Sequence, residues 1–431
     1  MISEILGSIA RAPALRSALL VAGAAVPVTG CDRPEAAAMG AESGVARPDS
    51  ARSDAAPAAD FKSVAAKVVR QSAGVGEGDI VLLSGSDEDL PLLEEIALEV
   101  RKLGGQPLVT VTSVGFDRRT FDEVPARYDS QTPRLTMKLA GIADVFITTE
   151  SAEGRSMKGV DPERMAARGK AFAPVGQLMT KRNVRTVALG NGLYPSAERA
   201  EQLGISREEL SGLMYRGIDA DYSKLQATGE QVRKALAAGK ELRITSPDGT
   251  DLRVEVGGRP VVVSDGVISA EDRKRGSPSV SVWLPAGEVF LTPVPGTANG
   301  VIVADHLYYE GDRIDGLRLE VKDGRMVAMS AKSGLGPMEE YYKHAGAGKD
   351  AFSVVDIGIN PSIEVPDGGA VNVWSRAGAV TVVVGDNTWA GGDNRVNFSI
   401  PAEIKAATLE VDGRALVQDG KLTTGAVVAN R

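Results

Sequence analysis

Leu284-Pro-Ala-Gly-Glu-Val-Phe-Leu-Thr-Pro-Val-Pro-Gly-Thr-Ala-Asn-Gly-Val-Ile302 is the stretch that says most about the fold of this chain. One carboxylate, Glu288, stands between Gly287 and a short apolar run typical of a buried strand. A glycine-rich turn and a second apolar run follow. A carboxylate at the mouth of a buried strand loses its hydration, which costs free energy unless a positive group nearby compensates for it. The block therefore indicates a metal site, and other parts of the chain must supply the remaining ligands.

The composition is that of a globular protein, with 43% hydrophobic and 25% charged residues. A chain of 431 residues is too long for one ordinary domain, so two domains are expected. The formal net charge is −8, only 4% of residues are aromatic, and no long basic run occurs, which argues against a nucleic-acid partner. The two histidines are His306 and His344. This low number matters because imidazole is the commonest ligand of catalytic transition metals.

The single cysteine, Cys31, excludes an intrachain disulfide and follows a segment typical of exported proteins. Two arginines precede an apolar run, Ser17–Val28, that is too short to span a bilayer as a mature helix. Val28-Thr-Gly-Cys31 resembles a bacterial lipobox, so we expect residues 1–31 to be a lipoprotein signal peptide ending at the lipidated Cys31. The alternative is a chance or buried cysteine after an ordinary apolar segment.

Residues 32–60 are rich in Ala, Pro, Ser and Asp and cannot bury enough apolar surface to fold, which predicts a flexible tether. Acyl chains on Cys31 together with this tether would hold a folded body at the bacterial cell envelope.

Residues 61–230 alternate between strand and helix patterns. The runs Ile80–Leu83 and Pro107–Thr112 flank an amphipathic helix, Asp87–Leu103, whose acids come early and whose bases come late. Two further strands are expected at Ala143–Thr148 and Thr186–Leu189. This β-α-β order predicts an N-terminal α/β domain with a parallel sheet. Ser84-Gly-Ser86 matches no nucleotide-binding motif and is read as a strand-to-helix turn.

Residues 231–431 have a different sequence pattern, rich in runs typical of antiparallel strands. Hairpins are indicated around Asp248-Gly249, Lys322-Asp323-Gly324 and Asp412-Gly413, and Val371–Val384 is also strand-like. The predicted fold class is therefore an N-terminal parallel-sheet α/β domain followed by a mixed, largely antiparallel α+β domain, with a boundary near residue 230.

The block around Gly287-Glu288, the turn Gly296–Gly300 and the later segments Ile357-Gly-Ile-Asn-Pro361 and Gly391-Gly-Asp-Asn394 occur in an order and spacing that resemble the M29 metallo-aminopeptidases (the aminopeptidase T group). The resemblance covers roughly residues 61 to 420, so residues 231–431 are expected to form the M29-like second domain. It implies two divalent metals held by two glutamates, two histidines and an aspartate, with a tyrosine near the reacting centre. It also implies a homodimer.

Most of these ligand positions carry other residues in this chain. The first glutamate falls on Glu288, but the second falls on Val354, with Asp356 two residues further on the same strand face. The other positions fall, in order, on Thr381 for the first histidine, Thr388 for the tyrosine, and Ser399 and Pro401 for the closing histidine and aspartate. We therefore expect the metal centre to be degenerate.

Several readings of the remaining polar residues stay open. Glu288, Asp356, Asp386 and Asp393 would make an oxygen-rich site for Mg²⁺ or Ca²⁺, rather than Zn²⁺, if they converged. Otherwise Glu288 accepts backbone hydrogen bonds or pairs with an arginine such as Arg376 or Arg395, and the three aspartates are turn or cap residues. His306 is expected to be packed or at the surface, and His344 to be a solvated helix residue.

Two functions follow from these observations. In the first, the chain is a cell-envelope lipoprotein that is impaired or inactive as a two-metal peptidase and binds a peptide or another small ligand between its domains. In the second, it is an aminopeptidase that works through a rebuilt carboxylate site around Glu288 and Asp356. The expected cofactor is accordingly none or a divalent cation, Mg²⁺ or Ca²⁺ before Zn²⁺.

Overall fold

The computed structural model describes residues 60–113, 115–150, 158–309, 311–365 and 373–423. Cys31 and the predicted signal peptide lie outside these residues, as does all but the last residue of the predicted tether. Within the described ranges, no helix is both long enough and apolar enough to cross a bilayer.

Sheet A is a five-stranded parallel sheet in the order β2-β1-β3-β4-β8. Its strands are β1 (Ile80–Ser86), β2 (Gln106–Thr112), β3 (Val145–Thr149), β4 (Arg185–Leu189) and β8 (Ser281–Leu284). Every residue of β3 and β4 is buried, because helices cover both faces of the sheet. The predicted parallel α/β fold is thereby confirmed.

Alternate residues of β1 pack against different helices. Val81 and Leu83 join a core with α2 (Phe61–Ala66), α3 (Leu90–Lys102) and α8 (Arg207–Ile218), whereas Leu82 packs against the core of α5 (Arg134–Ile142) and α6 (Pro162–Lys181). This is the two-residue alternation of a strand covered on both faces. The other helices of this part are α4 (Phe116–Glu123), α7 (Ala197–Leu203), α9 (Tyr222–Ala238) and α10 (Ala270–Arg275), with short helices η1 (Lys67–Ser72), η2 (Asp87–Asp89) and η3 (Ala126–Tyr128).

A carboxylate of the chain itself occupies the carboxyl edge of β1 and β3, where open α/β sheets of this strand order commonly bind ligands. Asp89 accepts hydrogen bonds from the backbone N–H of Ser86 at 2.8 Å, the hydroxyl of Thr149 at 2.5 Å and the hydroxyl of Tyr194 at 2.7 Å. Ser86 is the N-cap of η2, as expected for a plain strand-to-helix turn.

Sheets B and C are antiparallel, and a large apolar core lies between them. Sheet C has the order β15-β14-β13-β9-β7, formed by β15 (Ser399–Glu403), β14 (Val380–Gly385), β13 (Phe352–Gly358), β9 (Glu288–Leu291) and β7 (Val261–Ser264). Sheet B has the order β12-β11-β10-β6-β5-β16-β17-β18, formed by β12 (Arg325–Ser330), β11 (Asp312–Lys322), β10 (Asn299–Tyr309), β6 (Asp251–Glu255), β5 (Glu241–Thr245), β16 (Thr408–Val411), β17 (Arg414–Gln418) and β18 (Lys421–Leu422). The helix α11 (Gly336–His344) and the short helix η5 (Thr388–Ala390) complete this half.

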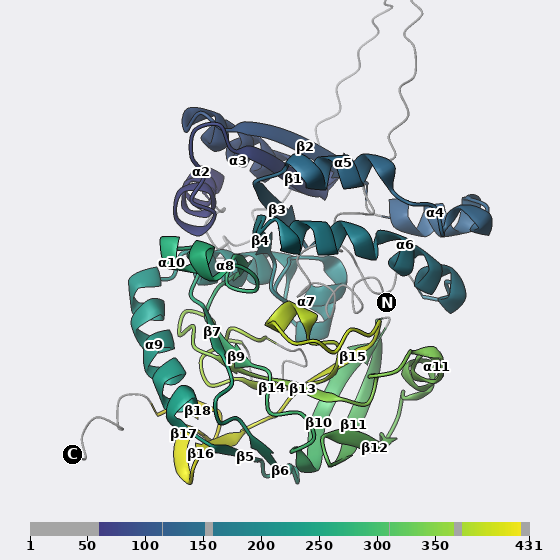
Figure 1. Ribbon diagram of the computed structural model, residues 1–431, viewed down its shortest axis with the longest axis vertical. Helices are drawn as coiled ribbons and strands as arrows, with labels where there is room; N and C mark the ends of the chain where they lie inside the picture. The colour runs from purple at the N-terminus through teal and green to yellow at the C-terminus, as the bar shows by residue number, and fades with distance from the viewer. Residues whose placement is uncertain (1–59, 114, 151–157, 310, 366–372, 424–431) are drawn as a thin grey trace, which may run out of the picture.

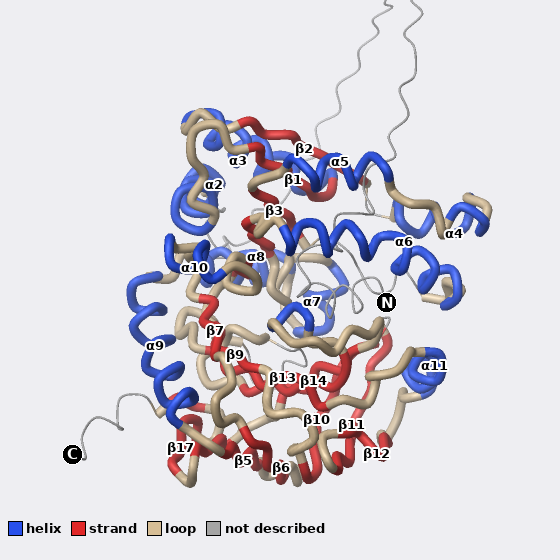
Figure 2. The backbone as a smooth tube through the Cα atoms, in the orientation of Figure 1, coloured by secondary structure: helices blue, strands red, loops and turns tan. Residues whose placement is uncertain are grey.

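Sheet C is the middle layer of the molecule. Figure 1 shows sheet A and its helices in the upper part of the view, sheet B at the bottom and the strands of sheet C between them, with α9 along one side. The tube in Figure 2 makes the same division visible, with most helices in the upper half and most strands in the lower half. One face of sheet C therefore meets sheet B, and the other meets the α/β half.

The stretch that begins at Leu284 takes the chain from sheet A to sheet C. β8 is the last strand of sheet A, and β9 begins four residues after it ends. Gly287, with φ 124°, allows this passage, because a side chain there would collide with Asn360. The boundary expected near residue 230 falls inside α9, and β8 returns to sheet A, so residues 231–431 do not form a body separate from that sheet.

Candidate functional site

Near the end of sheet C at which β9 begins, each strand contributes one polar side chain to the face that looks toward the α/β half. These residues are Ser264 on β7, Glu288 on β9, Asp356 on β13, Thr381 on β14 and Glu403 on β15, and we call them the polar band. The register places them together, since residues directly opposite in neighbouring strands point to the same face. Ser264 pairs with Glu288, Asp356 pairs with Thr381, and Thr381 pairs with Glu403.

Glu288 is fully buried at the first position of β9. Its Oε1 accepts a hydrogen bond from the side-chain amide of Asn191 at 3.1 Å, and the same amide donates to the carbonyl of Pro285 at 2.9 Å. Asn191 follows β4 with φ 42°, a conformation that Asn tolerates better than most residues. The expected arginine partners lie elsewhere, since Arg376 pairs with Glu403 and Arg395 is exposed.

Asp356 is the second buried carboxylate of the band, with 1% of its surface exposed. Glu288 pairs with Gly358 and Phe290 pairs with Asp356, so the two acids are diagonal neighbours on one face of two adjacent strands. Such neighbours lie about 7 to 8 Å apart between their Cα atoms. The sequence interpretation that put Asp356 near Glu288 thus agrees with the register of the sheet.

Two hydroxyls of the band stand beside these acids. The Thr381 side chain is next to Asp356, and the Ser264 side chain is next to Glu288. Thr381 is 1% exposed and Ser264 is 3% exposed, and neither hydroxyl has a hydrogen-bond partner within the described part of the chain. A buried hydroxyl without a partner costs free energy, so both groups are expected to meet a partner such as a ligand or water.

Glu403 ends the band in an ion pair. Its carboxylate accepts a hydrogen bond from the Arg376 guanidinium at 2.8 Å and another from the backbone N–H of Val373 at 3.0 Å. Arg199 of α7 adds positive charge from the α/β half, where its guanidinium donates to the carbonyl of Gly192. Burial lowers the pKa of Arg199 to about 10, while acidic neighbours that include Glu403 act in the opposite direction.

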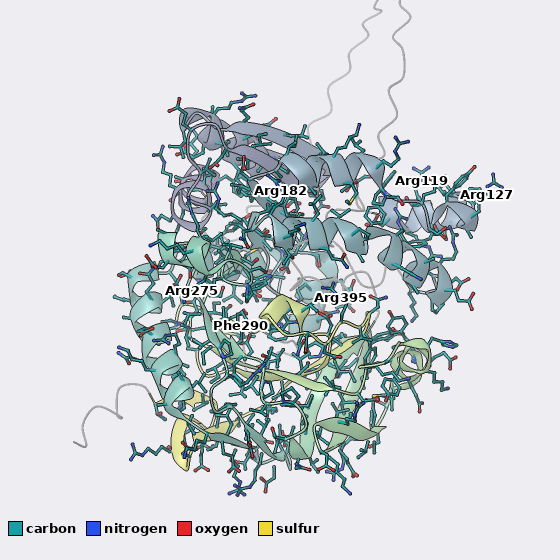
Figure 3. All side chains as sticks on the ribbon, in the orientation of Figure 1. Arg119, Arg127, Arg182, Arg275, Phe290 and Arg395 are labelled. Carbon is teal, nitrogen blue, oxygen red and sulfur yellow. The ribbon has the colours of Figure 1, made fainter. Side chains whose placement is uncertain are left out.

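An aromatic cluster adjoins the acids. It consists of Trp283, Phe290, Trp374 and Trp389, with ring centroids 5.2 to 6.3 Å apart in tilted or edge-on contacts. The chain has three tryptophans, so all of them lie in this cluster. Phe290 is the cross-strand partner of Asp356, and its label in Figure 3 lies where the green strands of sheet C meet the α/β half. The cluster joins β8 of sheet A to β9 of sheet C.

The segment that carries Trp374 closes over Gly358. A Cβ atom on Gly358 would collide with the carbonyl oxygens of Trp374 and Arg376. Asn360 fixes this arrangement, because its backbone N–H donates to Ser375 O at 2.8 Å and its side chain donates to Ala286 O at 2.7 Å. The Ile357–Pro361 motif therefore has a structural role beside Glu288. Val371–Val384 was expected to be strand-like. Of its described residues, 373–379 turn across the end of β13, and the strand begins at Val380.

Apart from Glu288, the positions to which the resemblance assigns the metal ligands and the tyrosine carry neutral residues and differ in their surroundings. Val354 lies in the aromatic cluster, and Pro401 pairs with Val383 beside it. Ser399, the first residue of β15, pairs with Gly385. The Thr388 hydroxyl donates hydrogen bonds to the two carboxylate oxygens of Asp386, at 3.0 and 3.1 Å. Thr381 alone among them sits in the polar band.

Two other candidate aspartates do not reach the band. Asp386 follows β14 at the end where Phe352 pairs with Val384, whereas Glu288 lies at the opposite end of the sheet. At the usual rise per residue of a β-strand, Asp386 and Glu288 lie about 25 Å apart along the sheet. Asp393 is exposed in a turn. The suggestion that four carboxylates converge is therefore wrong, because sheet C holds Asp386 and Glu288 at opposite ends.

The two histidines lie outside the band. His306 is on β10, with Nδ1 3.3 Å from the Asp305 carboxylate and its ring edge-on to Tyr308. His344 is exposed at the end of α11, with Nε2 3.3 Å from Glu340. These positions agree with a packed and a solvated histidine, respectively.

The described residues do not fit a two-metal centre. Nowhere in the described ranges do three or more His, Cys, Asp or Glu side chains gather in a way that could hold a metal ion. Two transition metals about 3.5 to 4 Å apart need several fixed ligands. The band offers Glu288 and Asp356, and its third carboxylate, Glu403, is paired with Arg376. The assignment of these two acids as metal ligands remains a prediction.

Several residues of the site were not singled out from the sequence: Asn191, Ser264, Trp283, Trp374 and Glu403. The Gly190-Asn191-Gly192 turn directly after β4 was a local signal for Asn191, because polar residues at the carboxyl ends of parallel strands commonly face a site. The others come from strands and turns far apart in the sequence, and only the pairing of sheet C brings them together.

Comparisons with known proteins agree with this architecture. Residues 58–347 match the sequence family described as thermophilic metalloprotease (M29). The match covers about two thirds of the chain and ends before β13, β14 and β15. Aminopeptidase PepS of Streptococcus thermophilus is 27% identical over 310 residues, which cover 64% of this chain and 71% of PepS.

Two solved structures share the fold. Wild-type AmpT from Thermus thermophilus superposes with a TM-score of 0.66 at 14% identity, covering 84% of this chain and 98% of AmpT. The 2,5-dihydroxypyridine dioxygenase of Pseudomonas putida KT2440 superposes with a TM-score of 0.55 at 15% identity, covering 84% of this chain and 96% of that protein. At these identities the likeness shows the fold alone.

Proposed function

Because this chain belongs to the M29 family of metalloproteases, we propose that it uses the aminopeptidase-like scaffold to bind a peptide or another small ligand, without two-metal peptidase activity. The family depends on metal ions, so the proposal depends on which residues this chain has at the positions of the metal ligands. The observation that carries it is the polar band, whose three carboxylates are Glu288 and Asp356 on neighbouring strands and Glu403, which is paired with Arg376. A centre that binds two transition metals needs more charged or imidazole ligands than this face offers.

The ligand positions implied by the resemblance support the same conclusion. Val354 and Pro401 lie beside or within the aromatic cluster, and a valine side chain has no group that binds a metal. The fold has nevertheless been kept, since AmpT superposes over 84% of the chain. A retained fold with replaced metal ligands is consistent with a protein that binds a ligand on this face without two-metal chemistry.

A second function has one observation in its favour. Glu288 and Asp356 share a face of sheet C, so one hard ion such as Mg²⁺ or Ca²⁺ could bridge them in a rebuilt site for aminopeptidase activity. Such ions take six or more oxygen ligands and acidify bound water less than Zn²⁺ does. This function ranks second because the polar side chains beside the two acids, those of Thr381, Ser264 and Asn191, are neutral, and the rest of the surroundings is the aromatic cluster.

Hydrolysis of aminoacyl-p-nitroanilides distinguishes the two. Wild type and Glu288→Ala are incubated with Mn²⁺, Co²⁺, Zn²⁺ or Ca²⁺, and an active aminopeptidase serves as the positive control. The binding proposal predicts no metal-dependent release of p-nitroaniline from either protein. Metal-dependent turnover that the Glu288→Ala change abolishes would establish the second function and defeat the first.

The location of the protein is proposed from residues that the structure does not describe. A lipid on Cys31 and a tether of about 30 residues would hold the folded body at the bacterial cell envelope after export. Labelled fatty acid should enter wild type but not Cys31→Ser, and no label in either protein would refute the anchor. The resemblance also suggests a homodimer, and sedimentation of the purified protein tests this directly.

A further inference from the structure

We propose that the end of the α/β half formed by β2 and α5 docks on the surface of an anionic lipid bilayer. The contact, which we call the lipid face, consists of Leu108 and Val111 on β2 and of Leu135, Leu139 and Ile142 on α5. This inference goes beyond the proposed function, because it concerns a surface at the other end of the molecule from sheet B. It requires no acyl chain on the cysteine.

Exposed apolar side chains are concentrated at this end of the molecule. Of the nine large hydrophobic side chains that are exposed in the described residues, one is Val327 on β12 and eight lie between residues 90 and 142. The eight are Leu90, Leu98, Leu108, Val111, Val124, Tyr128, Leu135 and Ile142. Figure 1 shows α3, β2 and α5, which carry six of them, at the top of the view. Exposed apolar groups gathered on one surface indicate an interaction site.

α5 has an apolar stripe on the side that does not pack against the protein. Met137 and Ala140 belong to the core that α5 forms with α6 and sheet A. Leu135, Leu139 and Ile142 follow one another at helical spacing on the opposite side of the helix. Leu135 is 51% exposed and Ile142 is 52% exposed. The stripe is therefore accessible to a partner.

The edge of sheet A adjoins this stripe. β2 is the edge strand, and Gln106–Thr112 contains no charged residue, although exposed edge strands commonly carry charges that prevent pairing with other chains. Leu108 pairs with Leu82, which packs against the core of α5 and α6, so Leu108 points to the side of the sheet that α5 covers. β2 and α5 thus contribute neighbouring parts of one apolar surface.

The charge of the lipid face is positive. Arg134 and Lys138 are exposed on α5, one on each side of Leu135. The segments that form the face, residues 104–116 and 130–143, contain no Asp or Glu, in a chain whose formal net charge is −8. An anionic bilayer attracts basic residues held at its surface.

The end of α6 adds a further positive charge beside α5. The Arg182 guanidinium donates to Ala140 O at 2.8 Å and to Ala143 O at 2.6 Å, which holds the end of α6 against α5. Arg182 lies 4.0 Å from Asp144, so its charge is partly compensated, whereas the neighbouring Lys181 is exposed. Figure 3 shows Arg182 in the upper part of the view, near the end that carries the lipid face.

This combination suits a bilayer better than a second copy of the chain. In a two-fold dimer the same surface meets itself, so Arg134 and Lys138 would face the same bases without an acid of the lipid face to pair with them. Phospholipid headgroups instead supply negative charge, and their hydrated layer leaves water for the free backbone groups of β2. The proposed tether leads to the same end, since it joins the folded body at Asp60, before α2, which packs against α3.

Vesicle sedimentation tests the contact without a lipid anchor. The full chain carrying Cys31→Ser is mixed with vesicles of phosphatidylglycerol and phosphatidylethanolamine, or with vesicles of phosphatidylcholine alone. All variants share this change and the same N-terminal segment, so differences between them report on the folded body. The proposal predicts binding to the anionic vesicles that is at least about ten-fold tighter than binding to phosphatidylcholine.

Substitutions on the lipid face should weaken this binding. Leu135→Ser combined with Ile142→Ser should reduce the affinity for anionic vesicles by at least about ten-fold, and Lys138→Glu by about ten-fold. The matched controls are Val327→Ser, at a side chain that is 61% exposed on β12, and Lys322→Glu, at an exposed base on β11. Both controls should bind as the parent chain does. Circular dichroism identifies any variant that fails to fold.

A fluorescent label shows which residues enter the bilayer, without removing an apolar contact from the rest of the face. Once Cys31→Ser has been made, Leu135→Cys or Val327→Cys supplies the single thiol for the environment-sensitive dye NBD. The dye at position 135 should become brighter and shift to shorter wavelength with anionic vesicles. The dye at position 327 should not change.

Several results would overturn the proposal: no binding of the Cys31→Ser chain to anionic vesicles, equal binding by the lipid-face and control variants, or no response of the dye at position 135. A dimer that Leu135→Ser with Ile142→Ser dissociates in the absence of vesicles would also overturn it, because a second copy would then cover the surface. Failure of Cys31 to take up fatty acid refutes only the anchor, and metal-dependent turnover refutes only the proposed function.

Discussion

Titration of the single residue Asp386 should change the free energy of unfolding of the whole protein. Burial raises the pKa of its carboxyl from 3.8 to about 6, against the hydrogen bonds that it accepts from Thr388 and Val396. The folded chain therefore binds this proton more tightly than the unfolded chain does. The resulting stability is fully present below about pH 4 and is lost as pH rises through about 6. Asp265, whose pKa is also raised to about 6, acts in the same direction.

The Asp386→Asn change tests this linkage. Between about pH 4 and 7, the free energy of unfolding of wild type should fall relative to that of the variant by on the order of 1 to 3 kcal/mol. Urea denaturation at several pH values measures the difference. A constant difference between the two proteins across this range would show that Asp386 is not the titrating group.

Asn191 is predicted to hold Glu288 in place. The Asn191→Gly change removes the hydrogen bonds to Glu288 and to Pro285 O while fitting the positive φ, so it should cost about 1 to 3 kcal/mol. Asn183→Gly is the matched control, because Asn183 also has a positive φ but is exposed. Equal thermal stability of both variants would contradict this role.

Among the elements, β13 and the segment that crosses its end depend on Gly358. Gly358→Ala should destabilise the fold by several kcal/mol, on the order of a severe core change, because the methyl group would strike the carbonyl oxygens of Trp374 and Arg376. Gly336→Ala at the start of α11 has open space around the added methyl and should be close to neutral. Thermal denaturation of the two variants gives the comparison, and similar midpoints would mean that the crossing segment moves aside freely.

The individual elements of the α/β half could be predicted because each carries its own pattern. Asp87–Leu103 has helical periodicity, early acids and late bases, and the structure has η2 and α3 there. The hairpin turn at Asp412-Gly413 could likewise be predicted, because Asp and Gly favour such turns. Both residues have a positive φ in the structure. Residues 373–379 could not be predicted, because an apolar run with glycines fits a strand as well as a buried turn.

For the molecule as a whole, the sequence could not show that β8 belongs to sheet A and β9 to sheet C. Both are short apolar strands, and only long-range pairing assigns them. The same limit applies to the site. Glu288 and Asp356 could be placed on one face from the resemblance and strand spacing, but Ser264, Trp283 and Trp374 reach them through contacts across the whole fold.

The central claim is that a metallopeptidase fold has lost the ligands for its metals. The most direct test is the metal content of protein purified without chelators and dialysed against metal-free buffer, measured by mass spectrometry of the elements. The claim predicts far less than one transition-metal atom per chain, with or without prior incubation in Zn²⁺, Mn²⁺ or Co²⁺. Two tightly held atoms of such a metal per chain, lost in Glu288→Ala, would contradict it.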